Sequence, residues 1–367
     1  MKKAAIIIPT YNEAGNIEKL ILSIKDVIAD IAQWNISVVV VDSTSKDKTA
    51  EIVQELAKKY KFVHLLSTKK EGLGKAYVHG FAYAIERLSP QVIFEMDADL
   101  SHDPKEIPHF LKKIENGADF VIGSRYTKGG STAQDWGIHR KISSMMGNLV
   151  LRFGFMKLGI KDWTDGYRAI KTWIIQDSMS HIQNYSGYVF QIALLDSALK
   201  RHATITEIPV HFKERTYGSS KINAFEYIAQ ILFYILWHSS FIKFVVVGGC
   251  GFILDFAISF ILIEKAHWDA WKATLISTES AIISNFIFNN FWSFAHKKVS
   301  GLGSYLKNFI KFNLVSSGSI LIQTLGVAFF DHIFGTQYWY LYKVFIIFFI
   351  VIPYSYILYN KLIWKDK

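Results

Sequence analysis

The sequence of 367 residues is long enough for roughly two domains of about 150 residues each. Hydrophobic residues make up 51% of the chain and aromatic residues 15%, which excludes an intrinsically disordered protein, since such proteins are poor in both. A single cysteine excludes an intramolecular disulfide framework. The net charge of +10 would permit nucleic-acid binding, but the distribution of the basic residues along the chain argues against it. All seven arginines precede residue 216, whereas every basic residue after 240 is a lysine.

Buried parallel strands are predicted at 4–9 and 37–42, where β-branched residues follow one another without polar alternation. Apolar residues at helical spacing predict a helix over 13–31, and short apolar runs at 93–96 and 120–123 predict two more strands. This alternation predicts a doubly wound, mostly parallel sheet, whose ligand binds beyond the carboxyl ends of the strands. The motifs GxGxxG and GxxxxGK[ST] are absent from the expected positions, which disfavours a dinucleotide site and a P-loop NTPase.

An acidic pair follows the third of these strands. Asp97 and Asp99 are two residues apart, so strand geometry puts both carboxylates on the same side of the backbone. Such oxygen ligands suit Mg²⁺ or Mn²⁺, which bridge carboxylates to substrate phosphates. Ser101 and His102 follow and could complete the site. A turn or a helix N-cap is the alternative for this segment, but acidic segments at three strand ends favour the metal.

Four apolar runs of membrane length, at 241–263, 273–294, 309–330 and 341–359, predict a transmembrane domain over 241–367. Buried helices of a soluble domain are the alternative, and four such runs in succession argue against it. The lysines gather on one side of these spans. They are Lys243, Lys297, Lys298, Lys307, Lys311, Lys361, Lys365 and Lys367. The positive-inside rule therefore predicts an integral membrane protein whose N-terminal domain and C-terminus are both cytoplasmic.

Two further segments are apolar but too short to span a membrane. Residues 223–240 are predicted to form an amphipathic helix that lies on the membrane surface, between an N-terminal domain at 1–222 and the spans. Residues 142–158 have a similar character, and a buried core helix is an equally acceptable interpretation for them.

The order of motifs over residues 3–222 resembles the polyprenyl-phosphate glycosyltransferases of family 2, and most of all the dolichol-phosphate mannose synthases. The motifs are IIIPTYNEAGNI, VVVVDSTSKDKT, MDADLSHDP, IGSRYTKGG, DGYRAIK, GYVFQ and RTYGSSKIN. The spans, with FIKFVVVGG and NFIFNNFWSF, resemble GtrA-like membrane domains. This resemblance implies a GT-A-type fold for the N-terminal domain.

The resemblance also implies a role for individual residues on the donor side. Pro9, Tyr11, Glu13 and Asp42 would bind the nucleotide of a nucleotide-sugar, with Asp97 close by. The pair Asp97 and Asp99 would hold the metal on the donor diphosphate, with Ser101 as a third ligand, and Asp99 would be catalytic. Arg215 and Lys221 would reach that diphosphate from a loop. Two positions depart from the family, since Ser43 replaces an Asp and Ala193 replaces a Glu.

On the acceptor side, the resemblance implies that Arg125, Arg140 and Ser144 hold the phosphate of a polyprenyl phosphate, with Arg125 also catalytic. Arg168 falls in another family motif and is expected beside a phosphate as well. Arginine suits these positions because its planar guanidinium recognises phosphate through paired hydrogen bonds.

A lipid phosphate is already an anion near neutral pH, so it can attack the sugar without a general base, and a single displacement would invert the anomeric centre. GDP-mannose is the favoured donor and UDP-glucose the alternative. A processive polysaccharide synthase and a lipid-sugar flippase are alternatives of other classes. The first is disfavoured because no Q-x-x-R-W motif occurs, and the second because the acidic pair and the arginines are intact.

Overall fold

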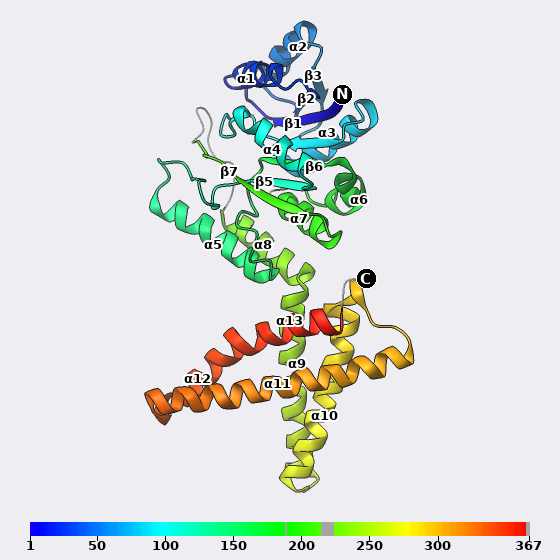
Figure 1. Ribbon diagram of the computed structural model, residues 1–367, viewed down its shortest axis with the longest axis vertical. Helices are drawn as coiled ribbons and strands as arrows, with labels where there is room; N and C mark the ends of the chain where they lie inside the picture. The colour runs from blue at the N-terminus through cyan, green and yellow to red at the C-terminus, as the bar shows by residue number, and fades with distance from the viewer. Residues whose placement is uncertain (188, 214–223, 365–367) are drawn as a thin grey trace. The chain divides into compact units, whose positions relative to one another are not determined.

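The computed structural model describes residues 1–187, 189–213 and 224–364. The chain divides into two compact units, Met1–Phe233 and Tyr234–Lys367, and each is described by itself (Figure 1). The N-terminal unit contains the strands, whereas the described part of the C-terminal unit is built from helices.

A seven-stranded sheet lies at the centre of the N-terminal unit, with the strand order β3-β2-β1-β4-β6-β5-β7. The strands are β1 (Lys2–Thr10), β2 (Trp34–Asp42), β3 (Val63–Ser67), β4 (Val92–Glu95), β5 (Phe120–Ser124), β6 (Arg168–Lys171) and β7 (Ile205–Pro209). All neighbours pair in parallel except β6, which runs antiparallel to both β4 and β5. The predicted mostly parallel sheet is confirmed, and the four predicted strands correspond to β1, β2, β4 and β5.

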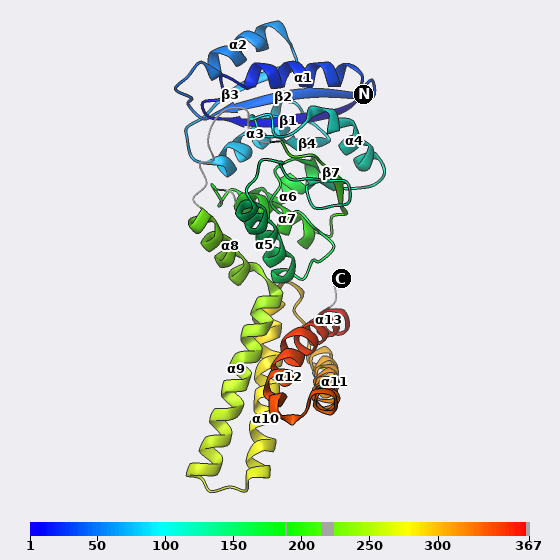
Figure 2. The same cartoon turned by 90° about the vertical axis from the view of Figure 1, so that its left-hand side faces the viewer.

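Helices lie on both sides of this sheet, and Figure 2 shows α1 and α2 on the opposite side of the strands from α3. The helices of this unit are α1 (Ile17–Ala29), α2 (Thr49–Lys59), α3 (Leu73–Arg87), α4 (Ile107–Glu115), α5 (Ile138–Gly154), α6 (Thr172–Ile182), α7 (Val189–Lys200) and α8 (Ala224–His238), the last of which crosses into the second unit.

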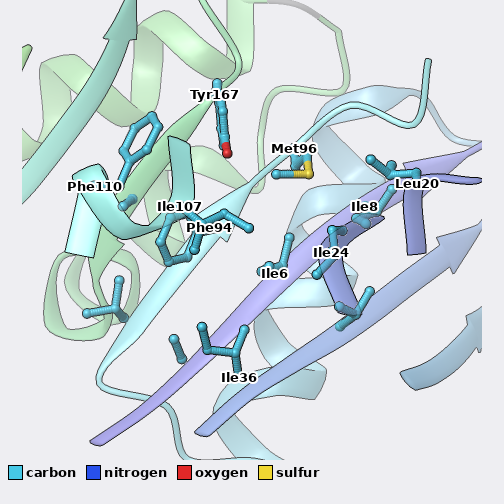
Figure 3. Close-up of a cluster of buried hydrophobic side chains, with 14 of the residues drawn as sticks. Ile6, Ile8, Leu20, Ile24, Ile36, Phe94, Met96, Ile107, Phe110 and Tyr167 are labelled. Atoms are coloured by element: carbon cyan, nitrogen blue, oxygen red, sulfur yellow. The ribbon is translucent and has the colours of Figure 1, made fainter. Parts of the chain in front are cut away.

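The two-sided packing explains why β1 lacks polar alternation. Ile6 and Ile8 belong to a buried cluster with Leu20 of α1 and Phe110 of α4 (Figure 3). Ile7 points to the opposite face and meets α3 at Gly80. Because both faces of the strand are buried, residues of either parity are apolar.

Gly80 is a point of close contact between α3 and the sheet. A Cβ at this position would lie 2.9 Å from Cγ2 of Val41 and in even closer contact with Cγ2 of Ile7. A side chain therefore cannot be accommodated without moving the helix or the strands.

The C-terminal unit contains α9 (Ser240–Phe260), α10 (Ala270–Phe288), α11 (Leu302–Phe334), α12 (Trp339–Ile346) and α13 (Ile352–Leu362). Among the described residues, three helical stretches are long and apolar enough to cross a membrane: Ser240–Lys265, Leu302–Phe334 and Val344–Leu362. They overlap the first, third and fourth of the predicted spans.

The second predicted span forms α10 and is not among these three stretches. Its polar side chains contact α9, the helix that lies beside it in both views (Figures 1 and 2). The Ser277 hydroxyl donates to Asp255 at 2.5 Å, and Asn285 packs over Gly251. Polar and small residues of this kind join helices within membranes. Some of the polar side chains of α10 are therefore explained by its contact with α9.

The segment predicted at 142–158 forms most of α5, and it is not a core helix. Only Asn148, Leu151 and Gly154 of α5 are buried. Its large apolar side chains lie at the surface instead, and they are Ile138, Ile142, Met145, Met146, Val150 and Phe153. The α8 helix, in the segment predicted to lie on a membrane, likewise exposes Ile228, Leu232, Phe233, Leu236 and Trp237.

Candidate active site

The predicted site residues meet at one edge of the sheet. The parallel strands β1, β2 and β4 end there, and Thr10 of β1 lies directly beside Asp42 of β2. Because β6 is antiparallel, its beginning lies at this same edge, since Arg168 pairs with Glu95 at the end of β4. The segment before β6 therefore joins the site, together with the loops that follow the parallel strands.

Asp42 stabilises the turn after β2 through hydrogen bonds. It is buried, with 2% of its surface exposed, and it accepts hydrogen bonds from the Thr10 hydroxyl at 3.1 Å and from the Ser45 backbone N–H at 3.0 Å. The neighbouring Ser43 donates its backbone N–H to Thr10. The predicted contact between Asp42 and a nucleotide therefore remains a prediction, because these contacts already give the carboxylate a role in folding.

The other predicted nucleotide-binding residues lie beside this turn. Pro9 is the second-last residue of β1, and Tyr11 comes directly after the strand. The Lys70 ammonium group lies 3.7 Å from the Tyr11 ring centroid. Glu13 accepts a hydrogen bond from the Asn16 amide at 2.9 Å and thereby orders the start of α1. Tyr11 thus presents an aromatic face with a cation over it at the edge of the sheet.

The acidic pair occupies the turn that follows β4. The Asp97 side chain is 35% exposed, whereas Asp99 is buried with 6% exposure. Ser101 donates both its backbone N–H, at 3.1 Å, and its hydroxyl, at 2.6 Å, to Oδ1 of Asp99. In this arrangement Ser101 orients Asp99.

These oxygen donors fit a hard divalent cation, since two carboxylates leave positions for substrate phosphate and water. No cluster of three or more His, Cys, Asp or Glu side chains suited to a metal occurs in the part of the chain that the structure describes. A metal at this turn would therefore depend on Asp97, Asp99 and groups supplied by the substrate.

His102 connects this turn to the segment before β6. Its Nδ1 accepts the Asp97 backbone N–H at 3.0 Å, and its Nε2 lies 3.7 Å from Oδ1 of Asp165. The ring stacks on Tyr167 with 4.9 Å between centroids. Asp165 is buried, and this burial raises the pKa of its carboxyl.

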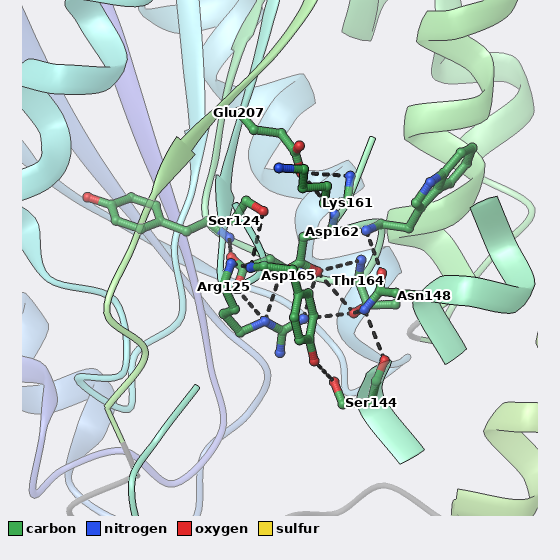
Figure 4. Close-up of polar contacts among 12 residues, drawn as sticks. Ser124, Arg125, Ser144, Asn148, Lys161, Asp162, Thr164, Asp165 and Glu207 are labelled. Atoms are coloured by element: carbon green, nitrogen blue, oxygen red, sulfur yellow. Dashed lines mark hydrogen bonds and ion pairs between the residues drawn. The ribbon is translucent and has the colours of Figure 1, made fainter. Parts of the chain in front are cut away.

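Arg125, at the end of β5, is held by the same segment (Figure 4). Its Nε and Nη2 form a fork of two hydrogen bonds to the Asp162 carboxylate at 2.8 and 2.7 Å, and Nε lies 3.3 Å from Oδ2 of Asp165. Burial opposes the charge on the guanidinium, but the two carboxylates raise the pKa of Arg125 above its ordinary value. The bidentate recognition expected toward a phosphate is thus directed toward Asp162.

The remaining predicted acceptor residues lie on α5. Ser144 accepts a hydrogen bond at 2.7 Å from the hydroxyl of Tyr126, the residue that follows Arg125 in the chain. Arg140 lies one turn earlier, and its guanidinium carbon is 4.2 Å from the Trp136 ring centroid. The structure therefore brings the neighbourhoods of Arg125, Arg140 and Ser144 together, with Trp136 between the two arginines.

The expectation that Arg168 lies beside a phosphate is wrong. Arg168 is fully buried and donates to the backbone carbonyls of Asp165, Trp163 and Gln191 at 2.7–2.8 Å. Its nearest carboxylate is that of Glu95, with 3.8 Å between Nε and Oε2. Arg168 therefore braces the segment before β6 from inside the protein.

Sequence reasoning missed Glu95, Asp162 and Asp165. The spacing of Asp162 and Asp165 just before the short β6 was a signal that could have pointed to paired carboxylates around an arginine. Ala193, which stands where the family has Glu, is fully buried in α7. Its methyl group needs no partner there, whereas a buried carboxylate would. The predicted residues Arg215 and Lys221 lie outside the described residues.

Comparison with known proteins identifies both parts of the chain. Residues 5–179 match the model for glycosyl transferase family 2, and residues 243–364 match the GtrA/DPMS transmembrane domain. Together with the three apolar helical stretches, the second match indicates a membrane protein.

Three curated relatives are similar over most of their length. Dolichol-phosphate mannosyltransferase of Pyrococcus furiosus is 32% identical over 87% of this chain and 88% of its own. Polyprenol monophosphomannose synthase of Mycolicibacterium smegmatis is 36% identical over 60% of this chain and 82% of its own. Undecaprenyl-phosphate mannosyltransferase of Micrococcus luteus is 35% identical over 59% and 86%. The chain therefore belongs to glycosyl transferase family 2, with a GT-A-like N-terminal domain followed by a GtrA/DPMS transmembrane domain.

Proposed function

We propose that this protein is an inverting polyprenyl-phosphate mannosyltransferase that uses GDP-mannose. The relatives support the sugar and the lipid class, since all three names specify mannose transfer or a polyprenyl-type phosphate mannose product. The observation that carries the proposal is the continuous network at the sheet edge. It runs from the Asp97 backbone N–H through His102 and Asp165 to Arg125, and so would connect the proposed donor side to the proposed acceptor side.

On the donor side, Asp97 and Asp99 would hold Mg²⁺ or Mn²⁺ against the diphosphate of the nucleotide-sugar. The metal supplies charge neutralisation for the departing diphosphate. Ser101 fixes the orientation of Asp99 through two hydrogen bonds. Tyr11, with Pro9, Glu13 and Asp42 nearby, would receive the nucleotide, and Arg215 and Lys221 would contact the diphosphate.

On the acceptor side, Arg125, Arg140 and Ser144 would bind the lipid phosphate. The phosphate oxygen attacks the anomeric carbon while the bond to the diphosphate breaks, so the sugar configuration inverts. The phosphate is ionised near neutral pH and gives up no proton, so no carboxylate has to act as a base. The protein contributes alignment and positive charge.

The membrane arrangement follows from the same proposal. The exposed apolar faces of α5 and α8 suit the interfacial region of a bilayer, where a polyprenyl phosphate presents its headgroup. The distribution of lysines favours a cytoplasmic catalytic domain, in keeping with a nucleotide-sugar donor.

The test is transfer by the purified full chain in detergent. GDP-[¹⁴C]mannose and UDP-[¹⁴C]glucose are each supplied with a short polyprenyl phosphate, with Mg²⁺, Mn²⁺ or EDTA. We expect a mild-acid-labile β-mannosyl lipid only from GDP-mannose with metal. We also expect Asp97→Asn and Asp99→Asn to lose at least about 100-fold in rate, while the exposed-site control Asp177→Asn retains full activity.

If glucosyl lipid is the main product, the donor is UDP-glucose and the proposed mannose specificity is wrong. An α-linked product would contradict inversion at the anomeric carbon. Polymer would indicate a processive synthase. An absence of transfer from either donor would favour the flippase.

A further inference from the structure

Among the contacts of the described residues, one edge of the Arg125 guanidinium is left for a ligand. Three of its five N–H groups are engaged: Nε–H and one Nη2–H bind Asp162, and the other Nη2–H binds the Thr164 hydroxyl at 2.8 Å. Within the described residues, the two hydrogens on Nη1 have no hydrogen-bond partner. In Figure 4 this nitrogen points away from the Asp162 carboxylate, with no dashed line reaching it.

The faces of the same group are flanked by aromatic rings. The guanidinium carbon lies 5.4 Å from the Tyr126 centroid, 5.7 Å from that of Phe212 and 5.9 Å from that of Trp136. Rings at this distance attract the cation and restrict access to it. An acceptor phosphate therefore meets Arg125 through Nη1, so the direction of that edge decides whether the contact can form.

Thr164 controls this direction, because its hydroxyl is the junction between Arg125 and α5. The hydroxyl oxygen accepts from Nη2 of Arg125 and from Nδ2 of Asn148 at 3.3 Å, while its hydrogen is directed to Oδ1 of Asp162 at 3.3 Å. All of its hydrogen-bonding capacity is in use.

Asn148 carries the connection into the helix. It is buried, its Nδ2 also donates to the Ser144 carbonyl at 3.1 Å, and its Oδ1 accepts the Trp163 backbone N–H at 2.7 Å. The helix turn that bears Ser144 is thus fixed to the segment that bears Thr164. As a result, hydrogen bonds through Thr164 and Asn148 connect Arg125 to the helix turn of Ser144.

We propose that Thr164 is a positioning residue of the acceptor site, which aims Nη1 of Arg125 and ties it to Ser144 through Asn148. The proposal rests on the proposed function, in that the ligand is taken to be a polyprenyl phosphate. Thr164 itself makes no contact with the lipid phosphate. Its effect reaches the acceptor through Arg125 and α5.

Thr164→Val tests this because valine has the same shape and lacks the hydroxyl. Thr164→Ser retains the hydroxyl and serves as the rescue variant. Thr172→Val is the matched control, since Thr172 is also half-buried and its hydroxyl also donates a hydrogen bond, to the Pro90 carbonyl at 2.6 Å, outside the site. The Asp162 fork remains in every variant, so Arg125 keeps its partner and the fold is expected to persist.

Two measurements use the full chain in detergent. The first is binding of a short polyprenyl phosphate without any sugar nucleotide, followed by tryptophan fluorescence, because Trp136 lies beside Arg125. The second is the KM for acceptor and for donor. We expect Thr164→Val to raise Kd and acceptor KM about tenfold, as for loss of a hydrogen bond to a charged group. Thr164→Ser and Thr172→Val should stay within about twofold of the unaltered chain, and the donor KM should not change in any of them.

The proposal is overturned if Thr164→Val binds the lipid phosphate as tightly as the unaltered chain, or if Thr164→Ser is as defective as Thr164→Val. It is also overturned if donor and acceptor KM rise together, because that pattern indicates general damage. If the unaltered chain binds the lipid phosphate but transfers no sugar, the proposed function fails, while the binding data still decide the role of Thr164.

Discussion

Glu95 should make the N-terminal unit lose stability as the pH rises. This carboxyl is fully buried at the end of β4, and burial raises its pKa from an ordinary value of 4.5 to about 8. Arg168 opposes the rise and Asp97 adds to it. Because the folded protein favours the protonated form, the contribution of Glu95 is complete below pH 4.5. It is lost progressively up to about pH 8.

The size of the effect follows from the interval between the two pKa values. At pH 7.5 the loss spans about three pH units at about 1.4 kcal/mol each, or about 4 kcal/mol. For a unit of this size, 1 kcal/mol corresponds to about 2–4 °C, so the melting temperature should differ by about 10 °C. Glu95→Gln resembles the protonated carboxyl and should avoid this loss.

The assay is thermal unfolding of the full chain in detergent from pH 5 to pH 8.5. Proteolysis with mass spectrometry reports the exposure of residues 2–209, and thereby follows the N-terminal unit. EDTA is present throughout, because a cation at Asp97 would reduce that residue's effect on Glu95. We expect Glu95→Gln and the unaltered chain to melt together at pH 5 and to diverge as the pH rises. The exposed-site control Glu86→Gln should follow the unaltered chain. Parallel curves for Glu95→Gln and the unaltered chain over the whole range would refute the reasoning.

Two other changes test the packing and the membrane face. Gly80→Ala should destabilise the N-terminal unit by about 1–3 kcal/mol, because the added methyl meets Val41 and Ile7, and a lowered melting temperature checks this. The exposed control Gly117→Ala has open space for a Cβ but a φ of +99°, so any cost there is from the backbone alone. Replacing both Ile142 and Met146 with Ser should raise the KM for long-chain acceptor in vesicles by about tenfold through lost apolar contact. The KM for a short, water-soluble acceptor should not change, and an equal rise for both acceptors would contradict a membrane role for α5.

The parallel part of the fold could be predicted from local pattern. The uninterrupted apolar runs of β1 and β2 reflect burial on both faces. The acidic pair does follow a strand as predicted, but β4 ends at Glu95, so the pair lies in a turn and not in strand geometry. The antiparallel β6 could not be predicted, because its sequence RAIK has only two apolar residues between two charged ones, and this pattern defines neither a strand nor its direction. This direction brings Asp162 and Asp165 to the site, so their omission from the prediction has the same cause.

The role of an individual arginine could not be predicted from its residue type and motif alone. Arg125 and Arg168 both occur in motif-like segments and both are buried. Among the described residues, however, Arg125 keeps two N–H groups without a partner, whereas Arg168 is fully enclosed in the core. The carboxylate partner of Arg125 is distant in the sequence, as Asp162 is 37 positions away. Arg168 contacts Asp165 and Trp163 nearby, but Gln191 and Glu95 lie far from it in the sequence. Asp42 differs, because its partner Ser45 is only three residues away and the turn they form was open to prediction from sequence.

The insertion of β6 between β4 and β5 also has a consequence for how the protein folds during synthesis. The first four strands to emerge, β1 to β4, can pair with one another as soon as residue 95 is available. The other half of the sheet has to wait for β6 at 168–171 and β7 at 205–209, which pair with much earlier segments. Such long-range pairing is slow. Since β7 ends at Pro209 and α9 begins at Ser240, every strand of the sheet is translated before the first long apolar helix. The order of the chain therefore lets the sheet domain emerge ahead of the membrane segments, and domains fold as units in the order in which they are made.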